Sequence, residues 1–393
     1  MQLVAYGAQD IYLTGNPQIT FFKVVYRRHT NFSMESIQQT FNGAADFGKR
    51  VTCTVSRNGD LIHRVYLQVE LPALSGLADT GGLGWCDWVG HALVKNVEVE
   101  IGGQRIDKQY GEWLHVWNEL TQCSGKKAGY GTMVGESIKS DVSATTVPAT
   151  TLYIPLEFWF SRNAGLALPL IALQYHEVKF NLEFNELANC VDGVTGASLS
   201  DATLYVDYIY LDTDERRRFA QVSHEYLIEQ LQFTGDETLV DGSNKFKLNF
   251  NHPCKELVWV CRSDAAEAGN WWFNFTTEGT ASTLDAEFAG VNPVTTAKLQ
   301  LNGHDRFSER GGKYFNYVQP YQHHENVPAE GINVYSFALK PEEHQPSGSC
   351  NFSRIDNATL QLTSSMAGKA KIFATNYNVL RVMSGMGGLA YSN

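Results

Sequence analysis

Hydrophobic and polar residues alternate along much of the chain with the two-residue period of a β-strand. The alternation is clearest in residues 64–71 (RVYLQVEL) and 97–101 (VEVEI). Such a pattern is typical of a strand with one buried and one solvated face. Together with the β-branched and aromatic content, it predicts strands in the first half near residues 35–41, 50–56, 62–71, 93–101, 104–107, 152–159, 176–185 and 203–211.

The second half shows the same succession of strands and long connections. Its strands are expected near residues 226–233, 245–250, 255–262, 294–301, 304–307, 332–339, 356–363 and 370–380. A helix is expected over residues 109–121, because Trp113, Val116 and Trp117 fall on one helical face. The long connections lie at matching places in the two halves, at 72–92 and 108–151, then at 263–293 and 308–331.

One short motif occurs twice at a constant spacing. VEVEIGGQRIDKQYGEW around Gly103 and KLQLNGHDRFSERGGKY around Gly303 both read as strand, glycine turn, return strand and second glycine. The first glycines lie 200 residues apart, and so do Gly111 and Gly311. A fixed internal offset indicates two copies of one unit. Eight antiparallel strands with two long loops are the plan of a jelly roll, so the predicted fold is all-β, with two tandem eight-stranded jelly rolls.

The segment between the halves, residues 212–220 (DTDERRRFA), predicts a short helix, since Asp212 and Glu215 have capping-box spacing. We therefore expect an N-terminal arm at 1–20, a first jelly roll at 21–212, a linker helix at 213–224 and a second jelly roll at 225–393. The basic triplet 216–218 invites a nucleic-acid interpretation, but pairing with acidic neighbours is preferred. The DxD at 212–214 is not expected to hold a metal.

Composition narrows the class of function. The formal net charge of −11 disfavours binding to nucleic acid or anionic lipid, because both require clustered lysine and arginine. The seven cysteines show no CxxC spacing, so we expect free thiols in a reducing compartment and no zinc site. The sequence shows neither a secretory signal nor a long apolar run, so no membrane span is expected.

No motif indicates catalysis. GxSxG, HExxH and GxxxxGK[ST] are absent. Residues 385–390 (GMGGLA) fit GxGxxA, but no helix is expected to follow, so this stretch is interpreted as a flexible glycine-rich tail. The clusters 323–325 (HHE) and 342–344 (EEH) could supply metal ligands or acid–base groups, and solvated loop polarity is the preferred interpretation. Catalytic residues, a metal site and a cofactor are therefore not expected.

Four Asn-x-Ser/Thr sequons are potential glycosylation sites. Without a secretory signal, modification by the secretory machinery is not expected, and a glycosylation pathway outside the secretory route is the minor alternative. The sequons lie at Asn31, Asn274, Asn351 and Asn357, and the last three are the candidate sites.

Five long strings carry a resemblance to a known family. They are residues 7–32 (GAQDIYLTGNPQITFFKVVYRRHTNF), 168–180 (LPLIALQYHEVKF), 212–220 (DTDERRRFA), 332–360 (INVYSFALKPEEHQPSGSCNFSRIDNATL) and 376–393 (NYNVLRVMSGMGGLAYSN). These strings closely resemble the major capsid proteins of nucleocytoplasmic large DNA viruses. The resemblance covers essentially the whole chain and is weakest in 72–92, 122–150 and 263–293.

The resemblance implies a double jelly roll that forms pseudo-hexagonal homotrimers. These would tile an icosahedral shell around an internal membrane, with the long connections forming an outer tower. The implied partners are further copies and minor capsid and penton proteins, with only indirect membrane contact and no direct nucleic-acid contact. The implied location is the virion capsid, assembled in a virus factory in the host cytoplasm. The arm would face the base, with candidate residues Tyr12, Phe21, Phe22, Arg27 and Arg28.

Aromatic residues in loops are candidate anchors between subunits. An equally weighted alternative is that they plug the ends of their own sandwiches. Two further functions stay open: a sugar-binding module, which a glycan array would reveal, and a carbohydrate hydrolase, which needs a cleft with paired carboxylates. The candidate anchors are Trp85, Trp88, Trp271 and Trp272.

Overall fold

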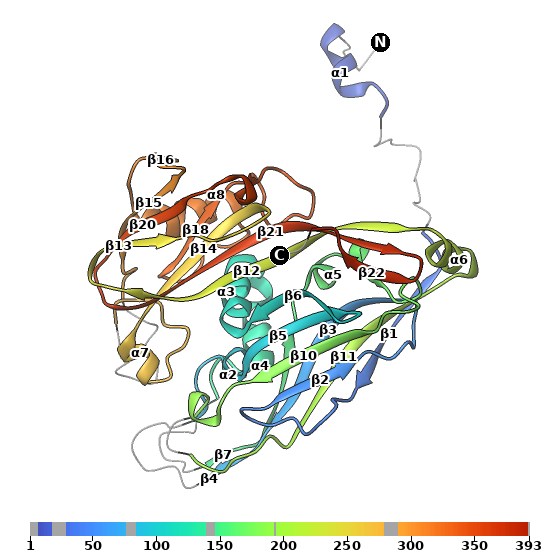
Figure 1. The fold of residues 1–393 in the computed structure, drawn as a ribbon, viewed down its shortest axis with the longest axis horizontal. Helices are drawn as coiled ribbons and strands as arrows, with labels where there is room; N and C mark the ends of the chain where they lie inside the picture. Colours follow the sequence, from blue (N-terminus) through green and yellow to red (C-terminus); the bar gives the residue numbers. More distant parts are fainter. Residues whose placement is uncertain are drawn as a thin grey trace, which may run out of the picture.

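Each half of the chain folds into two facing antiparallel sheets in a computed structural model that describes residues 7–17, 29–75, 84–138, 146–191, 194–278 and 290–391. In the first half one sheet has the strand order β1-β11-β3-β8 and the other β2-β10-β5-β6. We call this pair of sheets roll 1 (Figure 1). Its main strands are β1 (Phe32–Gln39), β2 (Arg50–Thr54), β3 (Leu61–Leu71), β5 (Val94–Ile101), β6 (Gln104–Tyr110), β8 (Thr150–Pro155), β10 (Val178–Phe184) and β11 (Asp201–Leu211).

The second half, roll 2, repeats this topology strand for strand. Its sheets have the orders β12-β21-β14-β18 and β13-β20-β15-β16. In both rolls the first, eighth, third and sixth main strands form one sheet, and the second, seventh, fourth and fifth form the other. The predicted double jelly roll is confirmed. The strands are β12 (His224–Leu239), β13 (Gly242–Lys247), β14 (Pro253–Ser263), β15 (Val294–Leu301), β16 (His304–Asp305), β18 (Ile332–Ser336), β20 (Ala358–Ser364) and β21 (Gly368–Met383).

Each roll encloses its own apolar core. On β3, the alternate residues Val65, Leu67 and Val69 are buried in the core of roll 1. On β14, Leu257 and Trp259 are buried in the core of roll 2. Full burial of such side chains contributes about 1.5–3 kcal/mol each. Two separate cores are the packing counterpart of the internal repeat.

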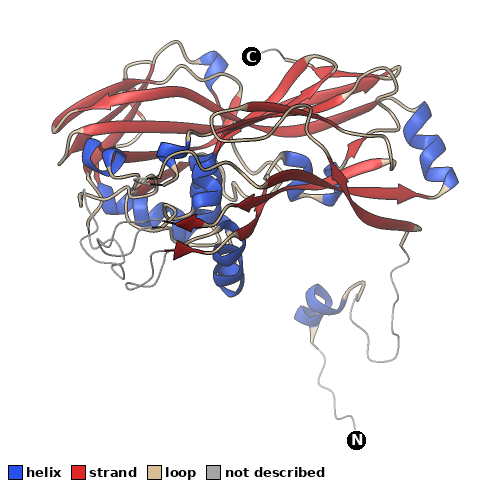
Figure 2. Ribbon diagram, turned by 90° about the horizontal axis from the view of Figure 1, so that it is seen from below, coloured by secondary structure: helices blue, strands red, loops and turns tan. Residues whose placement is uncertain are grey.

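Short helices fill the connections between strands (Figure 2). The expected helix over 109–121 is α3, and it begins at Gly111 because β6 continues to Tyr110. The linker helix is α6, where Asp212 is the N-cap and Arg216 pairs with Asp60 at 3.0 Å, as the charged-linker interpretation predicts. The helices are α2 (Val89–Leu93), α3 (Gly111–Thr121), α4 (Lys127–Val134), α5 (Trp159–Arg162), α6 (Thr213–Gln221), α7 (Asp264–Ala268), a π-helix (Tyr314–Val318) and α8 (Gln319–His323).

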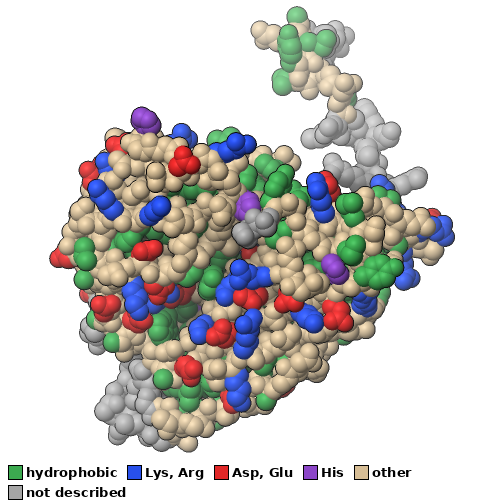
Figure 3. Space-filling view, viewed as in Figure 1, with side chains coloured by type: hydrophobic (Ala, Val, Ile, Leu, Met, Phe, Trp, Pro, Cys, Tyr) green, Lys and Arg blue, Asp and Glu red, His purple; other side chains and the backbone are tan. Residues whose placement is uncertain are grey.

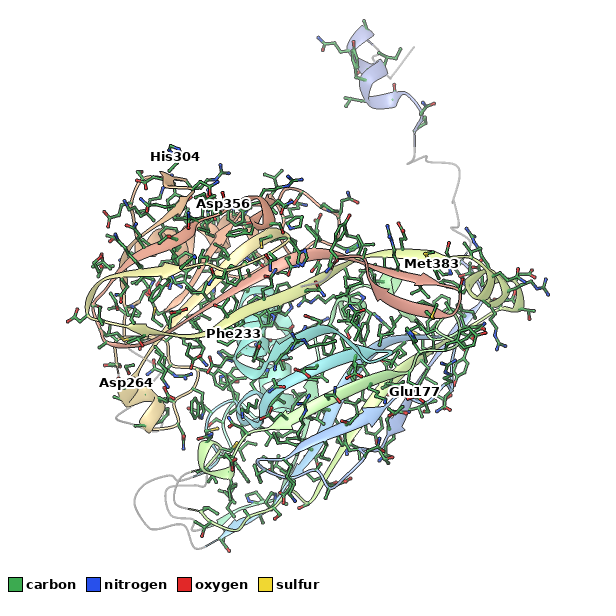
Figure 4. The ribbon with its side chains drawn as sticks, viewed as in Figure 1. Glu177, Phe233, Asp264, His304, Asp356 and Met383 are labelled. Carbon is green, nitrogen blue, oxygen red and sulfur yellow. The ribbon has the colours of Figure 1, made fainter. Side chains whose placement is uncertain are left out.

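The C-terminal segment is a strand, so the prediction of a flexible glycine-rich tail was wrong. Strand β22 (Met386–Leu389) pairs antiparallel with β21. The two-residue turn uses Ser384 and Gly385, whose φ angles are 52° and 80°. Positive φ at both central positions matches the twist of a tight hairpin, which explains the glycine. Figure 4 labels Met383, the last residue before this turn. Shorter strands are β4 (Leu74–Ser75), β7 (Thr146–Val147), β9 (Leu168–Pro169), β17 (Arg310–Gly311) and β19 (Cys350–Asn351).

The N-terminal arm contains a single turn of helix, α1 (Ile11–Thr14), which lies apart from both rolls in Figures 1 and 2. Its apolar side chains are almost uncovered: Ile11 is 62%, Tyr12 89% and Leu13 85% exposed. Exposed apolar clusters of this kind are typical of contact sites for another molecule.

Candidate functional site

The two rolls pack against each other through an apolar cluster and a set of ion pairs. On β14, Val258 and Val260 point away from the core of roll 2 and pack against α3 of roll 1. The Trp113 ring of α3 lies 5.3 Å from the Phe373 ring of β21. Helix α3 therefore covers the outer face of a sheet of roll 2. The apolar cluster comprises Trp88, Ala92, Trp113, Val116, Trp117, Leu120 and Val134 from roll 1, and Val258, Val260, Phe273, Phe275, Ile332, Val334 and Phe373 from roll 2.

A charged rim borders this apolar contact. Glu112 Oε1 lies 2.6 Å from an Arg262 Nη atom and 2.8 Å from Lys371 Nζ, so one carboxylate of roll 1 joins two cations of roll 2. Burial would raise the pKa of Glu112, but the two cations outweigh it and lower the pKa. Figure 3 shows a hollow between the rolls with charged groups around it, and Figure 4 labels Phe233 there. The cavity holds about 230 Å³ and is lined by residues that include Tyr110, Glu112, Phe233, Arg262, Lys371 and Phe373.

Replacing Glu112 by Gln should weaken the contact between the rolls. The amide keeps the shape and one acceptor oxygen but leaves Arg262 and Lys371 without a charge partner at this point. We expect a loss of about 1–3 kcal/mol in the free energy of unfolding. Urea titration monitored by tryptophan fluorescence measures it, with Glu177→Gln on the outside of roll 1 as the matched control. An equal effect of both substitutions would contradict the assigned role.

Two buried histidines lie in the same contact. The rings of His91 and His115 are 5.6 Å apart, and Phe273 of roll 2 packs against both. His91 Nε2 lies 2.9 Å from the Tyr130 hydroxyl. Burial lowers the pKa of His115 to about 4, with Glu119 opposing and Lys127 adding to the shift. Burial, and then His115, lower the pKa of His91 as well.

These histidines should make the fold sensitive to acid. The folded-state pKa of His115 lies below the ordinary value of 6.5, so its stabilising effect is complete above pH 6.5 and is lost as the pH falls toward 4. Between pH 6.5 and 4.5 the free energy of unfolding should fall by about 2 kcal/mol less in His115→Phe than in the original protein. Unfolding free energies of both proteins at the two pH values measure it. An unchanged acid loss would contradict the assignment.

A second polar group is buried at the other end of β14. His324 has a fully buried side chain, with Nε2 3.0 Å from Glu256 Oε2 and Nδ1 2.8 Å from Glu342 Oε1. Beside it, Lys255 Nζ lies 2.7 Å from Glu229, and Arg162 of roll 1 lies 3.2 Å from the other oxygen of Glu229. We call these six residues the buried ionic cluster. It balances three cations against three carboxylates and ties α5 of roll 1 to roll 2.

The buried ionic cluster corrects one interpretation of the sequence. Solvated loop polarity was preferred for residues 323–325 and 342–344, which is wrong for His324 because its side chain is fully buried. Sequence reasoning missed the partners, because Glu256 lies in an apolar run 68 residues away. The only available signal was Lys255-Glu256 inside that run. Among the described residues no group of three or more His, Cys, Asp or Glu side chains could hold a metal ion.

Main-chain contacts also join the rolls. The Leu231 N–H of β12 donates to Asp107 Oδ1 at 3.1 Å, and the Gln230 side chain donates to the Ile106 carbonyl. Burial raises the pKa of Asp107 to about 6, although the Leu231 N–H opposes the shift. These bonds place the edge strand β6 of roll 1 against β12 of roll 2 and fix how the rolls meet.

The four candidate tryptophans lie in different surroundings, and Trp88 and Trp272 are part of the contact between the rolls. Trp85 is 1% exposed and stacks on Phe47, inside roll 1, while Trp88 is buried in the cluster between the rolls. Trp272 is half-buried, and its Nε1 donates to the Asn189 carbonyl at 2.6 Å; Trp271 is also half-buried. Trp85 thus packs inside its own roll, whereas Trp88 lies between the two rolls of one chain. An anchoring role between subunits stays a prediction for all four.

The other candidate residues are the asparagines of the sequons and the base residues of the arm. Asn274 is 1% exposed, and its side chain forms hydrogen bonds with Thr276 and with the Glu278 carbonyl. The folded chain therefore leaves this sequon inaccessible to a glycosylating enzyme. Asn351 and Asn357 are exposed, and their glycosylation stays a prediction. Tyr12 is exposed on the arm. The remaining base candidates, Phe21, Phe22, Arg27 and Arg28, lie outside the described residues. All seven cysteines are free in the structure.

Comparison with known proteins identifies the family. Residues 20–212 match the family "Major capsid protein N-terminus", and residues 215–388 match "Large eukaryotic DNA virus major capsid protein". The chain belongs to this family. A major capsid protein of Pyramimonas orientalis virus is 61% identical over 420 residues, covering 100% of this chain and 99% of the relative. One of Phaeocystis pouchetii virus is 51% identical over 516 residues, with the same coverage.

A solved capsid structure shows the same architecture. The structure "PBCV-1 virus capsid, quasi-atomic model" matches with a TM-score of 0.82 and 40% identity, over 95% of this chain and 100% of that chain. The capsid resemblance drawn from the sequence is confirmed. The protein is a structural capsid subunit and not an enzyme, as the family assigns. In the part of the chain that the structure describes, no helix is long and apolar enough to cross a membrane.

Proposed function

We propose that three copies of this capsid protein form a pseudo-hexagonal trimer that tiles an icosahedral shell. The observation that supports it most directly is the contact between the rolls. Helix α3 of one roll covers the outer sheet face of an equivalent roll, so the contact joins two different surfaces of one repeated unit. A head-to-tail contact of this type closes into a ring when the rotation permits. Six rolls from three chains would make such a ring.

The same capsid role suggests where other components bind. The exposed apolar residues of the arm, Ile11, Tyr12 and Leu13, favour a contact at the base with minor capsid proteins near the internal membrane. Penton proteins would complete the vertices, where a six-fold tile cannot fit. Assembly would take place in the virus factory of the host cytoplasm. Direct contact with the genome is disfavoured by the net charge of −11.

The mass and outline of the purified protein test the proposed trimer. Light scattering should give three times the 43.8 kDa chain mass, and negative-stain images should show hexagonal outlines. A stable monomer at micromolar concentration would contradict self-assembly of the trimer. Addition of salt to assembled shells should release intact trimers, because contacts between trimers are expected to be smaller and more polar. Monomers released before trimers would contradict this order.

A further inference from the structure

One sheet face of roll 1 is only partly covered and carries tyrosines. The rings of Tyr66 and Tyr205 stack with centroids 5.2 Å apart, and Tyr153 lies beside them with 40% of its surface exposed. We call these three residues the tyrosine face. A cavity of about 380 Å³ opens on it, lined by residues that include Arg64, Tyr66, Met133, Tyr153, Pro155 and Asp207.

The tyrosine face occupies the place that α3 covers in roll 2. Strands β3 and β14 are both the third main strand and both 11 residues long, so residue 66 corresponds to residue 258. Across the sheet, Tyr66 pairs with Tyr205 and Pro155, and Val258 pairs with Phe373 and Val334. Val258, Val334 and Phe373 all lie under the helices of roll 1 in the cluster between the rolls. Their counterparts in roll 1, Tyr66, Pro155 and Tyr205, are only half-buried, with Met133 of α4 and Ser161 of α5 at the edge of the cavity.

Roll 2 also carries an uncovered counterpart of α3. The segment 314–323, which holds the π-helix and α8, follows the fifth strand of its roll, as α3 does in roll 1. Leu114 of α3 is buried in the core of roll 1, and Phe315 is buried in the core of roll 2. Matching these two positions sets Tyr317, Val318 and Tyr321 against Val116, Trp117 and Leu120 of α3. The three roll 2 residues are 37%, 39% and 80% exposed, whereas their α3 counterparts are buried.

We propose that the segment 314–323 of one copy docks on the tyrosine face of a second copy of this chain. This inference rests on the proposed trimer and names the surfaces that build it. The contact between chains then repeats the contact between rolls within a chain, with Tyr317, Val318 and Tyr321 in the place of the α3 side chains. One tyrosine ring enters the cavity beside Tyr153, where its hydroxyl group reaches Arg64 or Asp207 at the rim.

A charge pair agrees with this match. Within the chain, Glu112 of α3 pairs with Arg262 of β14 at 2.6 Å. By the same correspondences, position 112 matches Lys313 and position 262 matches Glu70. Both side chains are exposed, and neither has an ion partner within the described residues of its own chain. The signs are reversed at both positions, so the pair between chains stays complementary.

Charge reversal tests this pair. We expect Glu70→Lys and Lys313→Glu each to weaken trimer formation at least about tenfold, because like charges then face each other. The dissociation constant of the double variant should return to within about threefold of that of the original protein, since the ion pair is restored with its two charges exchanged. Sedimentation equilibrium of the full chain measures the dissociation constant of the trimer. The matched control is Lys340→Glu, a reversal at an exposed lysine outside both surfaces.

Cross-linking gives a second readout that does not depend on affinity. Tyr153→Cys and Tyr321→Cys are introduced together on a background in which the exposed Cys123 is replaced by Ser. A short bis-maleimide should then join chains into covalent dimers and closed trimers. The control pairs Tyr153→Cys with Tyr175→Cys, another exposed tyrosine, and should give no such ladder.

The outcomes separate this inference from the proposed function. A trimer of the original protein that neither reversal weakens and that the 153–321 pair does not cross-link would overturn the assigned surfaces while leaving the trimer intact. An original protein that stays monomeric would overturn the trimer itself. Rescue by the double variant, together with cross-linked trimers, would support both.

Discussion

Replacing Trp113 by Ala should lower the free energy of unfolding by about 3–5 kcal/mol, as expected for the loss of a large buried aromatic side chain. Trp113 is 1% exposed and lies between α3 and the outer sheet face of roll 2. Its ring contacts the rings of Trp117 and Phe373, which come from different rolls. The cavity left by Trp113→Ala would therefore lie where the two rolls meet. We expect the lost free energy of unfolding to weaken mainly the coupling between the rolls.

Calorimetry distinguishes coupling from general destabilisation. In the original protein we expect the rolls to unfold in one transition, because their shared cluster links the two cores. Trp113→Ala should separate this into two transitions, since each roll retains its own core. Tyr175→Ala, at a 75% exposed aromatic, is the control and should change stability by less than about 0.5 kcal/mol. A single transition at an unchanged temperature in Trp113→Ala would contradict the role of the contact.

The strands of the two rolls could be predicted because most expose one face. On β3, alternate residues are buried in the core of roll 1, and Arg64 and Glu70 are exposed. On β14 nearly every residue is buried, because α3 covers the face that would otherwise meet solvent. Residues 255–262 were still predicted as a strand from their β-branched and aromatic content. The pattern alone gave no indication of what covers the second face.

The contact between the rolls could be predicted only in part. The apolar stripe of α3, with Trp113, Val116 and Trp117, was predicted, but its partner surface lies more than 130 residues further along the chain. The sequence around His324 predicts a solvated loop residue, since the neighbouring His323 and Glu325 are polar. Its burial depends on Glu256 and Glu342, and one sequence does not reveal such long-range pairing.

Replacing His324 by Leu should destabilise the chain by about 3–5 kcal/mol, because it leaves Glu256 as a buried carboxylate without its nearest cation. Both side chains are fully buried, so water cannot replace the lost partner. The double variant His324→Leu/Glu256→Leu should recover most of the loss, since it removes the buried charge together with its partner. His304→Leu, at an exposed histidine near the far tip of roll 2 in Figure 4, is the matched control.

The same pair should make stability fall in alkali. Burial alone would lower the pKa of His324, but Glu256 and Glu342 outweigh it and raise the pKa to about 9. The stabilising effect of the protonated ring is therefore complete below pH 6.5 and is lost as the pH rises through about 9, a change of about 3 kcal/mol. In acid the pair also loses stabilisation, because Glu256 has a lowered pKa in the folded chain. The full stabilising effect of the pair is therefore present only above the ordinary carboxyl pKa of 4.5. Guanidinium unfolding at pH 6, 7.5 and 9.5 should show the alkaline loss in the original protein and in His304→Leu, but not in the double variant. If the free energy of unfolding fell equally between pH 7.5 and 9.5 in the double variant and in the original protein, other groups would cause the alkaline loss of stability.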